Sequence, residues 1–309
     1  MQVLLSVILP VFLVIGAGYG LRWKGVFSNE DIDTLTRFAQ NVAIPCLLFT
    51  AITQIDLAQS FAWPLLVSFY AGAFSGFALG LLGARFLFKR DWEDSVAIGF
   101  VGLFSNSVLL GLPITERAFG MDALAGNYAI IAVHSPLCLG LGITAMEIAK
   151  AAGKSLHQVP LDIAKSMSRN PLIIGIVLGL VVNLSGMPMP QATLDALSLL
   201  VRAALPVALF GLGGVLYQYR PEGDMLTIAY VVAISILVHP LISWGLARSF
   251  ELDQNATRSV MVTAAAPPGI NVYLFANLYG RGKRVAASAV LIGTTLSLFT
   301  MWGWLALLP

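Results

Sequence analysis

Apolar residues fill this chain in successive long runs, and short polar segments separate the runs. A bilayer core roughly 30 Å thick needs about 20 apolar residues in each helix that crosses it. The pattern predicts ten membrane-spanning helices, at residues 3–21, 36–53, 63–84, 95–115, 124–147, 171–187, 197–216, 225–247, 258–279 and 286–307. A longer polar segment, residues 148–170, divides these spans into five and five.

The composition supports an all-α integral membrane protein. The chain is 58% hydrophobic and 11% charged, whereas soluble domains carry about 25% charged residues. A formal net charge of +2 gives no argument for a nucleic-acid partner, and we expect none. No basic residue precedes the first apolar run, so we interpret this run as a retained helix rather than a signal peptide.

Basic residues gather in alternate loops. Those that follow the odd-numbered spans are Arg22, Lys24, Arg85, Lys89, Arg90, Lys150, Lys154, Lys165, Arg169, Arg220, Arg281, Lys283 and Arg284. The opposite loops hold only Arg117, Arg248 and Arg258. Because cytoplasmic loops are enriched in Lys and Arg, this asymmetry predicts that both termini lie outside the cytoplasm.

An internal repeat indicates how the two halves are related. Residues 44–49 (IPCLLF) resemble residues 205–210 (LPVALF) at an offset of 161 positions. Each half holds an odd number of spans, so the second copy must cross the bilayer in the opposite direction. We therefore predict a first five-helix repeat at 1–147, a cytoplasmic linker at 148–170 and an inverted second repeat at 171–309.

Helix-breaking residues lie near the middle of two predicted spans. Pro267 and Pro268 are adjacent and precede Gly269 in the ninth span, so an unbroken helix there is unfavourable. The fourth span carries Pro113, which predicts either a break or a kink. Broken helices place half-helix N-termini, each with roughly half a positive charge, inside the membrane, where they favour an anion.

Polar residues accompany both breaks. Ser105, Asn106 and Ser107 lie in the fourth span, and Asn271 follows Gly269 in the ninth. We predict that these side chains and the Pro267–Gly269 backbone bind an anionic substrate. The alternative is that each asparagine forms a hydrogen bond between helices.

Two further residues occupy equivalent repeat positions. Arg202 lies four residues before Pro206, and Asn41 lies four residues before Pro45. An intramembrane arginine is a candidate for pairing with an anion, although it could also extend to the membrane surface. His134 and His239 each lie near a proline and are either titratable relays or packing residues.

The acidic residues lie in loops or at the predicted ends of helices, so no carboxylate marks an ion-coupling site in mid-membrane. Cys46 and Cys138 fall in separate apolar runs without metal-ligand spacing. No hydrolase, P-loop or metalloprotease motif occurs. We therefore expect no catalytic residue, no metal, no cofactor and no enzymatic activity.

Several short motifs resemble those of the auxin efflux carrier family. In the fourth and ninth spans they are Asn106, 111–113 (GLP), 118–120 (AFG), Pro267, Gly269, Ile270, Phe275, Ala276 and Tyr279, and in the seventh span 208–213 (ALFGLG). The likeness covers nearly the whole chain. Plant members of that family have a proline where this chain has Ser105, and many carry a long cytoplasmic loop that this chain lacks.

The resemblance implies an inverted-repeat fold in which spans 4 and 9 cross. It also implies a scaffold of spans 1, 2, 6 and 7, a mobile bundle of spans 3–5 and 8–10, and elevator-like movement. A homodimer in the bacterial inner membrane, surrounded by lipid, is the expected assembly.

We predict a secondary carrier for a small carboxylate such as malonate. Within transport, the alternatives are a carrier of auxin-like aromatic acids and a sodium-coupled organic-acid symporter of similar fold. A membrane ligand sensor and a membrane-embedded enzyme are the alternatives outside transport, and the absence of a signalling domain and of clustered catalytic residues counts against them.

Overall fold

The computed structural model describes residues 4–150 and 168–308, and within these residues all regular structure is helical. Seven helical segments are long and apolar enough to cross a membrane: Leu5–Trp23, Asn29–Gln54, Trp63–Phe86, Ala125–Lys150, Gln191–Gln218, Met225–Ser249 and Lys283–Ala306. The chain is therefore built as an integral membrane protein. Most of the predicted linker, with Lys154 and Lys165, lies outside the described residues.

The α-helices before the linker are α1 (Leu9–Trp23), α2 (Asn29–Phe38), α3 (Ile44–Gln54), α4 (Leu57–Ser60), α5 (Trp63–Phe86), α6 (Trp92–Leu103), α7 (Leu112–Phe119) and α8 (Ala125–Lys150). Those after it are α10 (Pro171–Ser185), α11 (Gln191–Gln218), α12 (Met225–Ala233), α13 (His239–Ser249), α14 (Gln254–Ala265), α15 (Ile270–Tyr279) and α16 (Lys283–Ala306). The predicted spans 4 and 9 each correspond to a pair of short helices, and span 6 corresponds to the shorter α10.

Wide π-helical turns precede four prolines. The turns are η1 (Leu4–Ile8), η2 (Ala39–Ala43), η3 (Ser107–Gly111) and η6 (Ile234–Val238), and the prolines are Pro10, Pro45, Pro113 and Pro240. A proline ring clashes with the carbonyl four residues earlier and donates no hydrogen bond. A wider turn relieves this clash, so α2 continues through η2 into α3, and α12 continues through η6 into α13.

The second membrane helix begins earlier than hydropathy predicts, at Asn29 rather than residue 36. The Ser28 hydroxyl accepts a hydrogen bond from the Asp31 N–H at 3.1 Å, and the Asp31 carboxylate accepts one from the Ser28 N–H at 2.8 Å. This capping box satisfies N–H groups that a helix start leaves unpaired. The first turns of α2 are polar, so hydropathy alone does not detect them.

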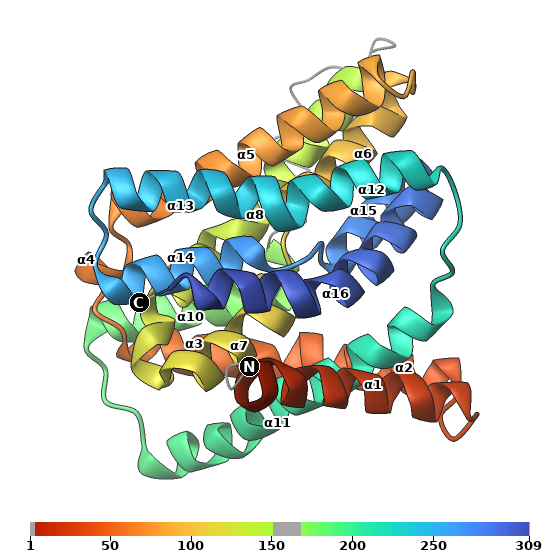
Figure 1. Cartoon of the computed structure of the whole chain (residues 1–309). Helices are drawn as coiled ribbons and strands as arrows, with labels where there is room; N and C mark the ends of the chain where they lie inside the picture. Colours follow the sequence, from red (N-terminus) through yellow and green to blue (C-terminus); the bar gives the residue numbers. More distant parts are fainter. Residues whose placement is uncertain (1–3, 151–167, 309) are drawn as a thin grey trace.

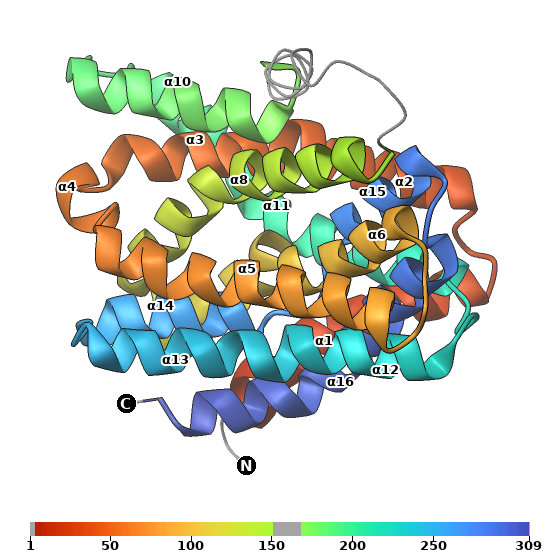
Figure 2. The same cartoon turned by 90° about the horizontal axis from the view of Figure 1, so that it is seen from above.

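Two close helix pairs connect the N-terminal and C-terminal parts of the chain. Helix α1 packs along α11, and α3 packs along α10; Figure 1 shows the first pair at the bottom of the molecule, and Figure 2 the second along one edge. A side chain added at Gly18 would overlap the carbonyl of Phe210, and one added at Gly175 would overlap that of Pro45. Glycine at these positions lets the backbones of each pair touch.

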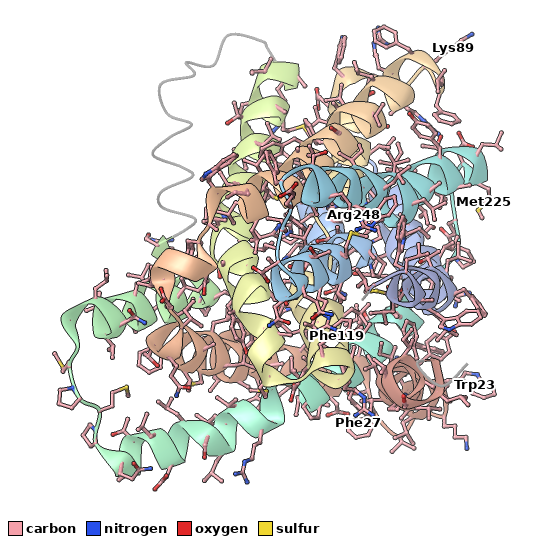
Figure 3. The ribbon with its side chains drawn as sticks, turned by 60° about the vertical axis from the view of Figure 1, so that its left-hand side comes forward. Trp23, Phe27, Lys89, Phe119, Met225 and Arg248 are labelled. Carbon is pink, nitrogen blue, oxygen red and sulfur yellow. The ribbon has the colours of Figure 1, made fainter. Side chains whose placement is uncertain are left out.

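The links between helices gather at two opposite ends of the molecule. Those after α1, α5, α11 and α15 lie at the right-hand end in Figure 1, and those that join α10 to α11 and α13 to α14 lie at the left. In Figure 3, Trp23, Lys89 and Met225 lie along one edge, whereas Phe27, Phe119 and Arg248 lie away from it. The grouping of the links in Figure 1 agrees with helices that cross the membrane in turn.

Ion pairs join several helix ends at the first of these two ends. Nε of Arg281 lies 2.8 Å from Glu93 and its Nη1 lies 3.2 Å from Asp91, which connects the α15–α16 link to the beginning of α6. The hydrogen bond to Glu93 is the main cause that raises the pKa of Arg281. Asp224 caps α12 and pairs with Arg90 at 3.2 Å. The pKa of Asp224 is lowered, mainly because its carboxylate accepts a hydrogen bond from the Thr227 hydroxyl.

Candidate functional site

Two helices are interrupted in the middle of the molecule, and the interruptions contact each other. The first lies between α6 and η3, and the second between α14 and α15 (Figure 1). Ser105 and Pro268 form an isolated antiparallel bridge. The N–H of Asn106 donates to the Pro267 carbonyl at 2.7 Å, and the N–H of Gly269 donates to the Phe104 carbonyl at 3.0 Å.

The two interruptions have different causes. Pro267 and Pro268 have no N–H groups, so α14 cannot continue through them. The first interruption contains no proline, and its extended backbone is instead held by the hydrogen bonds to the second. Backbone groups buried without partners would cost several kcal/mol in this setting, so each interruption satisfies the other.

A helix begins beside each interruption without a capping side chain. The first helical turn of η3 follows Asn106, and that of α15 follows Gly269, and neither of these cap residues accepts a side-chain hydrogen bond from the turn. The first N–H groups of a helix have no partner within it, and the end carries roughly half a positive charge. Both ends therefore offer hydrogen-bond donors.

A cavity of about 340 Å³ lies against the two interruptions. Helical turns of η2 and α8 and the beginning of α10 complete its walls. The predicted site residues that line it are Asn41, Ser105, Asn106, Ser107, Gly269 and Asn271. The structure thus brings together residues that are up to 230 positions apart, since Asn41 and Asn271 share one cavity.

Two buried polar atoms of residues that line this cavity have no hydrogen-bond partner among the described residues: Nδ2 of Asn106 and Oγ of Ser105. The two residues are 5% and 2% exposed. An unpaired buried polar group costs about 1–3 kcal/mol, so such a cluster is unfavourable in an empty packed core. Both groups can donate a hydrogen bond, so a ligand with acceptor oxygens that reached them would satisfy both.

The walls of the cavity are electrically neutral. No Asp, Glu, Lys or Arg of the described chain lines it, and the polar residues are amides, hydroxyls and His134. The described walls thus offer a ligand hydrogen-bond donors and helix ends but no charged side chain. Burying an anion in such a place is favourable only when these donors converge on it.

Arg202 and Pro113 lie elsewhere. Both line a second cavity of about 830 Å³, together with Pro206, Glu116 and Arg117, and none of these five residues lines the first cavity. The structure therefore separates Arg202 from Asn106, although Asn41, its repeat equivalent, lies in the first cavity. Pro113 is the second residue of α7, after the π turn and not within the interruption.

Pro267 and Pro268 do not line the first cavity. Pro267 contributes its carbonyl to the contact with Asn106, and Pro268 packs against α16 beside Gly293. The two prolines thus fix the backbone around the cavity but do not line it.

Sequence reasoning did not select Gln40, His134 and Asn170, which also line the cavity. Asn170 accepts a hydrogen bond from the N–H of Leu172 at 3.0 Å and so caps α10. His134 was the one detectable signal, because a histidine near a proline in mid-span is compatible with a site as well as with packing. Only the fold distinguishes the two.

Comparisons with known proteins define the class of protein to which this chain belongs. Residues 3–305 match a family model described as "Membrane transport protein". The chain belongs to this family, whose members are membrane transporters and not enzymes.

The relatives narrow the class further. A Rhizobium meliloti protein named "Putative malonate transporter" is 23% identical, over 98% of this chain and 95% of its own length. An "Uncharacterized transporter" of Methanothermobacter thermautotrophicus is 25% identical, over 96% of both chains. A rice protein named "Probable auxin efflux carrier component 5a" is 22% identical, over 96% of this chain and 94% of its own. The resemblance to the auxin efflux carrier family is thereby confirmed.

Proposed function

We propose that this transporter is a secondary carrier for a small carboxylate, and that the anion binds in the cavity between the two interrupted helices. The observation that carries the proposal is that Asn106 and Ser105, whose Nδ2 and Oγ atoms are buried without a partner, line a neutral cavity beside two uncapped helix starts. These groups match the acceptor oxygens of a carboxylate.

Malonate is the first substrate to test. The name of the Rhizobium meliloti relative supports this choice, and the cavity volume of about 340 Å³ suits a small molecule. Auxin-like aromatic acids are the second class to test, because the rice relative carries that name. Both classes present a carboxylate, so a common recognition by Asn106 is compatible with either.

The proposed architecture is a pair of inverted five-span repeats. Its support is reciprocal packing, since α1 packs on α11 and α10 packs on α3, so the first span of each half lies against the second span of the other. Asp91 and Asp253 cap α6 and α14 in the same way, each accepting from the N–H three residues later. The two interruptions likewise occupy corresponding positions in the two halves, after α6 and after α14.

We assign alternating access to elevator-like movement of the bundle that contains both interruptions. The cavity is lined by the interruptions and α8, which belong to the proposed mobile bundle, and by η2, α3 and α10, which belong to the proposed scaffold. Sliding of the bundle past the scaffold would carry the anion while its contacts to the interruptions are kept. A homodimer in the bacterial inner membrane, with both termini outside the cytoplasm, completes the proposal.

The direct experiment is uptake of labelled malonate into proteoliposomes, with indole-3-acetate in parallel and with or without a sodium gradient. We expect saturable malonate uptake that unlabelled malonate inhibits and that does not need sodium. Absence of uptake for both acids, from protein that is folded and correctly inserted, would contradict the proposed function. Uptake of the aromatic acid alone would move the substrate to the auxin class.

A further inference from the structure

The second cavity is separated from the first by about one helical turn. Three helical segments line both cavities without sharing a residue between them, and on each segment three positions separate the lining residues. These pairs are Ile44 and Leu47 on α3, Leu109 and Leu112 at the junction of η3 and α7, and Ile131 and Tyr128 on α8. Three residues advance about 4.5 Å along a helix. A thin layer of mostly apolar side chains therefore divides the two cavities.

The two cavities also lie between the same two groups of helices. The second cavity is lined by α7 and α8 of the proposed mobile bundle and by α1, α3 and α11 of the proposed scaffold. It includes Pro10 and Met121, near the beginning of α1 and the link between α7 and α8. The beginning of α1 lies beside α7 (Figure 1). This is the side that we propose to be outside the cytoplasm.

Unlike the first cavity, the second has charged walls. Arg117 and Glu116 of α7 and Arg202 of α11 line it. The guanidinium of Arg117 is already used, because it donates to the carbonyls of Ser6 at 2.7 Å and Val7 at 3.3 Å. Arg202 is exposed and forms no hydrogen bond or ion pair with the described residues. Its guanidinium is therefore available to a ligand.

We propose that the second cavity admits the acid on the side of the membrane opposite the first cavity, and that Arg202 binds the carboxylate there. The inference rests on the proposed function. Arg202 lies in the interior of α11, and an arginine inside a membrane helix is costly unless it faces a cavity or a partner. The fork of N–H groups on its guanidinium matches a carboxylate.

Glu116 gives the inference a second sign. Its carboxylate lines the same cavity and forms no ion pair with the described residues, so it repels an anion that Arg202 attracts. Removing either charge should therefore change capture of the acid in opposite directions. A loss of packing at the cavity would impair capture in both cases.

The first arm is the concentration dependence of malonate uptake by intact cells, where the second cavity faces the medium. In medium of low ionic strength, Arg202→Gln should raise KM about 5- to 10-fold, the effect of one unit charge near an anion, with the maximal rate unchanged. Arg202→Lys should keep most of the native KM, and Glu116→Gln should lower KM. Salt should reduce each difference, because it screens charges that water reaches.

Arg248→Gln is the matched control for this arm. Arg248 is predicted on the same side of the membrane, contacts the ring of Trp244 and lines neither cavity. Its removal should leave KM unchanged. A native KM in Arg202→Gln, or a higher KM in Glu116→Gln, would overturn the inference.

The second arm measures the charge of the cavity without a substrate. Leu205→Cys lines the second cavity and is made in a chain that carries Cys46→Ala and Cys138→Ala, so that it is the sole thiol. Membrane-impermeant methanethiosulfonates, one anionic and one cationic, are added to the medium. We expect labelling from outside, and a ratio of anionic to cationic labelling rates that falls about 5- to 10-fold with Arg202→Gln. Absence of labelling from the medium would overturn the inference.

The two arms separate this inference from the function on which it rests. If the native protein transports neither malonate nor indole-3-acetate, the proposed function fails, and the entry of an acid through the second cavity fails with it. If the native protein transports an acid but Arg202→Gln changes neither KM nor the labelling ratio, only the inference fails.

Discussion

The two helix interruptions contact each other, but they differ in what holds their shape and in which polar groups they leave unpaired. The second, at Pro267–Gly269, is made by residues that cannot form a helix and places no polar side chain in an unsatisfied position. The first, at Phe104–Asn106, has no proline and carries the two unpartnered groups of Ser105 and Asn106. Under the proposed function, the second segment provides rigidity and the first provides the contacts to the ligand.

This division has a physical reason. A segment that binds a ligand through free donors would lose them if it used those donors to hold its own shape. Here the prolines fix one segment, and its Pro267 carbonyl and Gly269 N–H then fix the other through backbone bonds alone. The side chains of Ser105 and Asn106 remain available.

The strongest test of this comparison is Asn106→Ala. Loss of a hydrogen bond to a charged ligand should weaken malonate binding by about 1.5–3 kcal/mol, while the melting temperature stays the same or rises because a buried unpaired amide is removed. Calorimetry and thermal unfolding measure the two quantities. Asn277→Ala, an exposed position on α15 away from the cavity, should change neither. Equal affinity in native and Asn106→Ala protein would remove recognition from the first interruption.

Gly293→Ala tests the structural role of the second interruption. A Cβ at this position would lie 2.8 Å from Cδ of Pro268, so we expect the free energy of unfolding to fall by about 1–3 kcal/mol. Thermal unfolding in detergent is the measurement. Gly303→Ala on the same helix meets nothing within 4 Å and should be neutral or stabilising. If both variants lose stability alike, the packing of Pro268 is not the cause.

Ser105→Ala should have a smaller effect of the same kind as Asn106→Ala. Removing the hydroxyl should weaken malonate binding by about 1 kcal/mol without loss of stability, because Oγ makes no hydrogen bond within the described chain. Binding and unfolding measured side by side check both statements. Loss of stability without loss of binding would give the first interruption a structural role instead.

Asp224→Asn should have the smallest effect, and it lies outside both interruptions. Because the pKa of Asp224 is lowered from 3.8, its carboxylate adds stability at higher pH, and this contribution is lost as pH falls through its folded value. We expect the native melting temperature to decline more steeply in acid than that of Asp224→Asn. Parallel curves would show that this carboxylate does not contribute.

Much of the architecture could be predicted from local patterns. Hydropathy indicates the long spans, and the adjacent Pro267 and Pro268 indicate the second interruption, because both effects act within a few residues. The first interruption is different. Its break at Phe104–Asn106 depends on hydrogen bonds to a segment about 160 positions away, and Pro113, the local signal, only begins α7.

The candidate site shows the same limit. Asn106 is detectable because a polar residue in an apolar span needs an explanation, and it does line the cavity. Arg202 satisfied the same criterion and faces the other cavity. The repeat position of Arg202 predicts how far along the helix this residue lies. It does not predict which side of the helix its side chain faces. The cavity itself is formed by five separate segments, and no local pattern encodes how they meet.

The packing of α1 on α11 and of α3 on α10 joins the two halves of the chain, and this constrains the order in which the protein can fold. When ribosomes have completed only the first 150 residues, α11 and α10 do not yet exist, so α1 and α3 lack these partners and Gly18 lacks its contact with the Phe210 carbonyl. Each half must therefore wait for the other before its tightest contacts form. Expressed separately, the two halves should be degraded, and expressed together in one cell they should assemble.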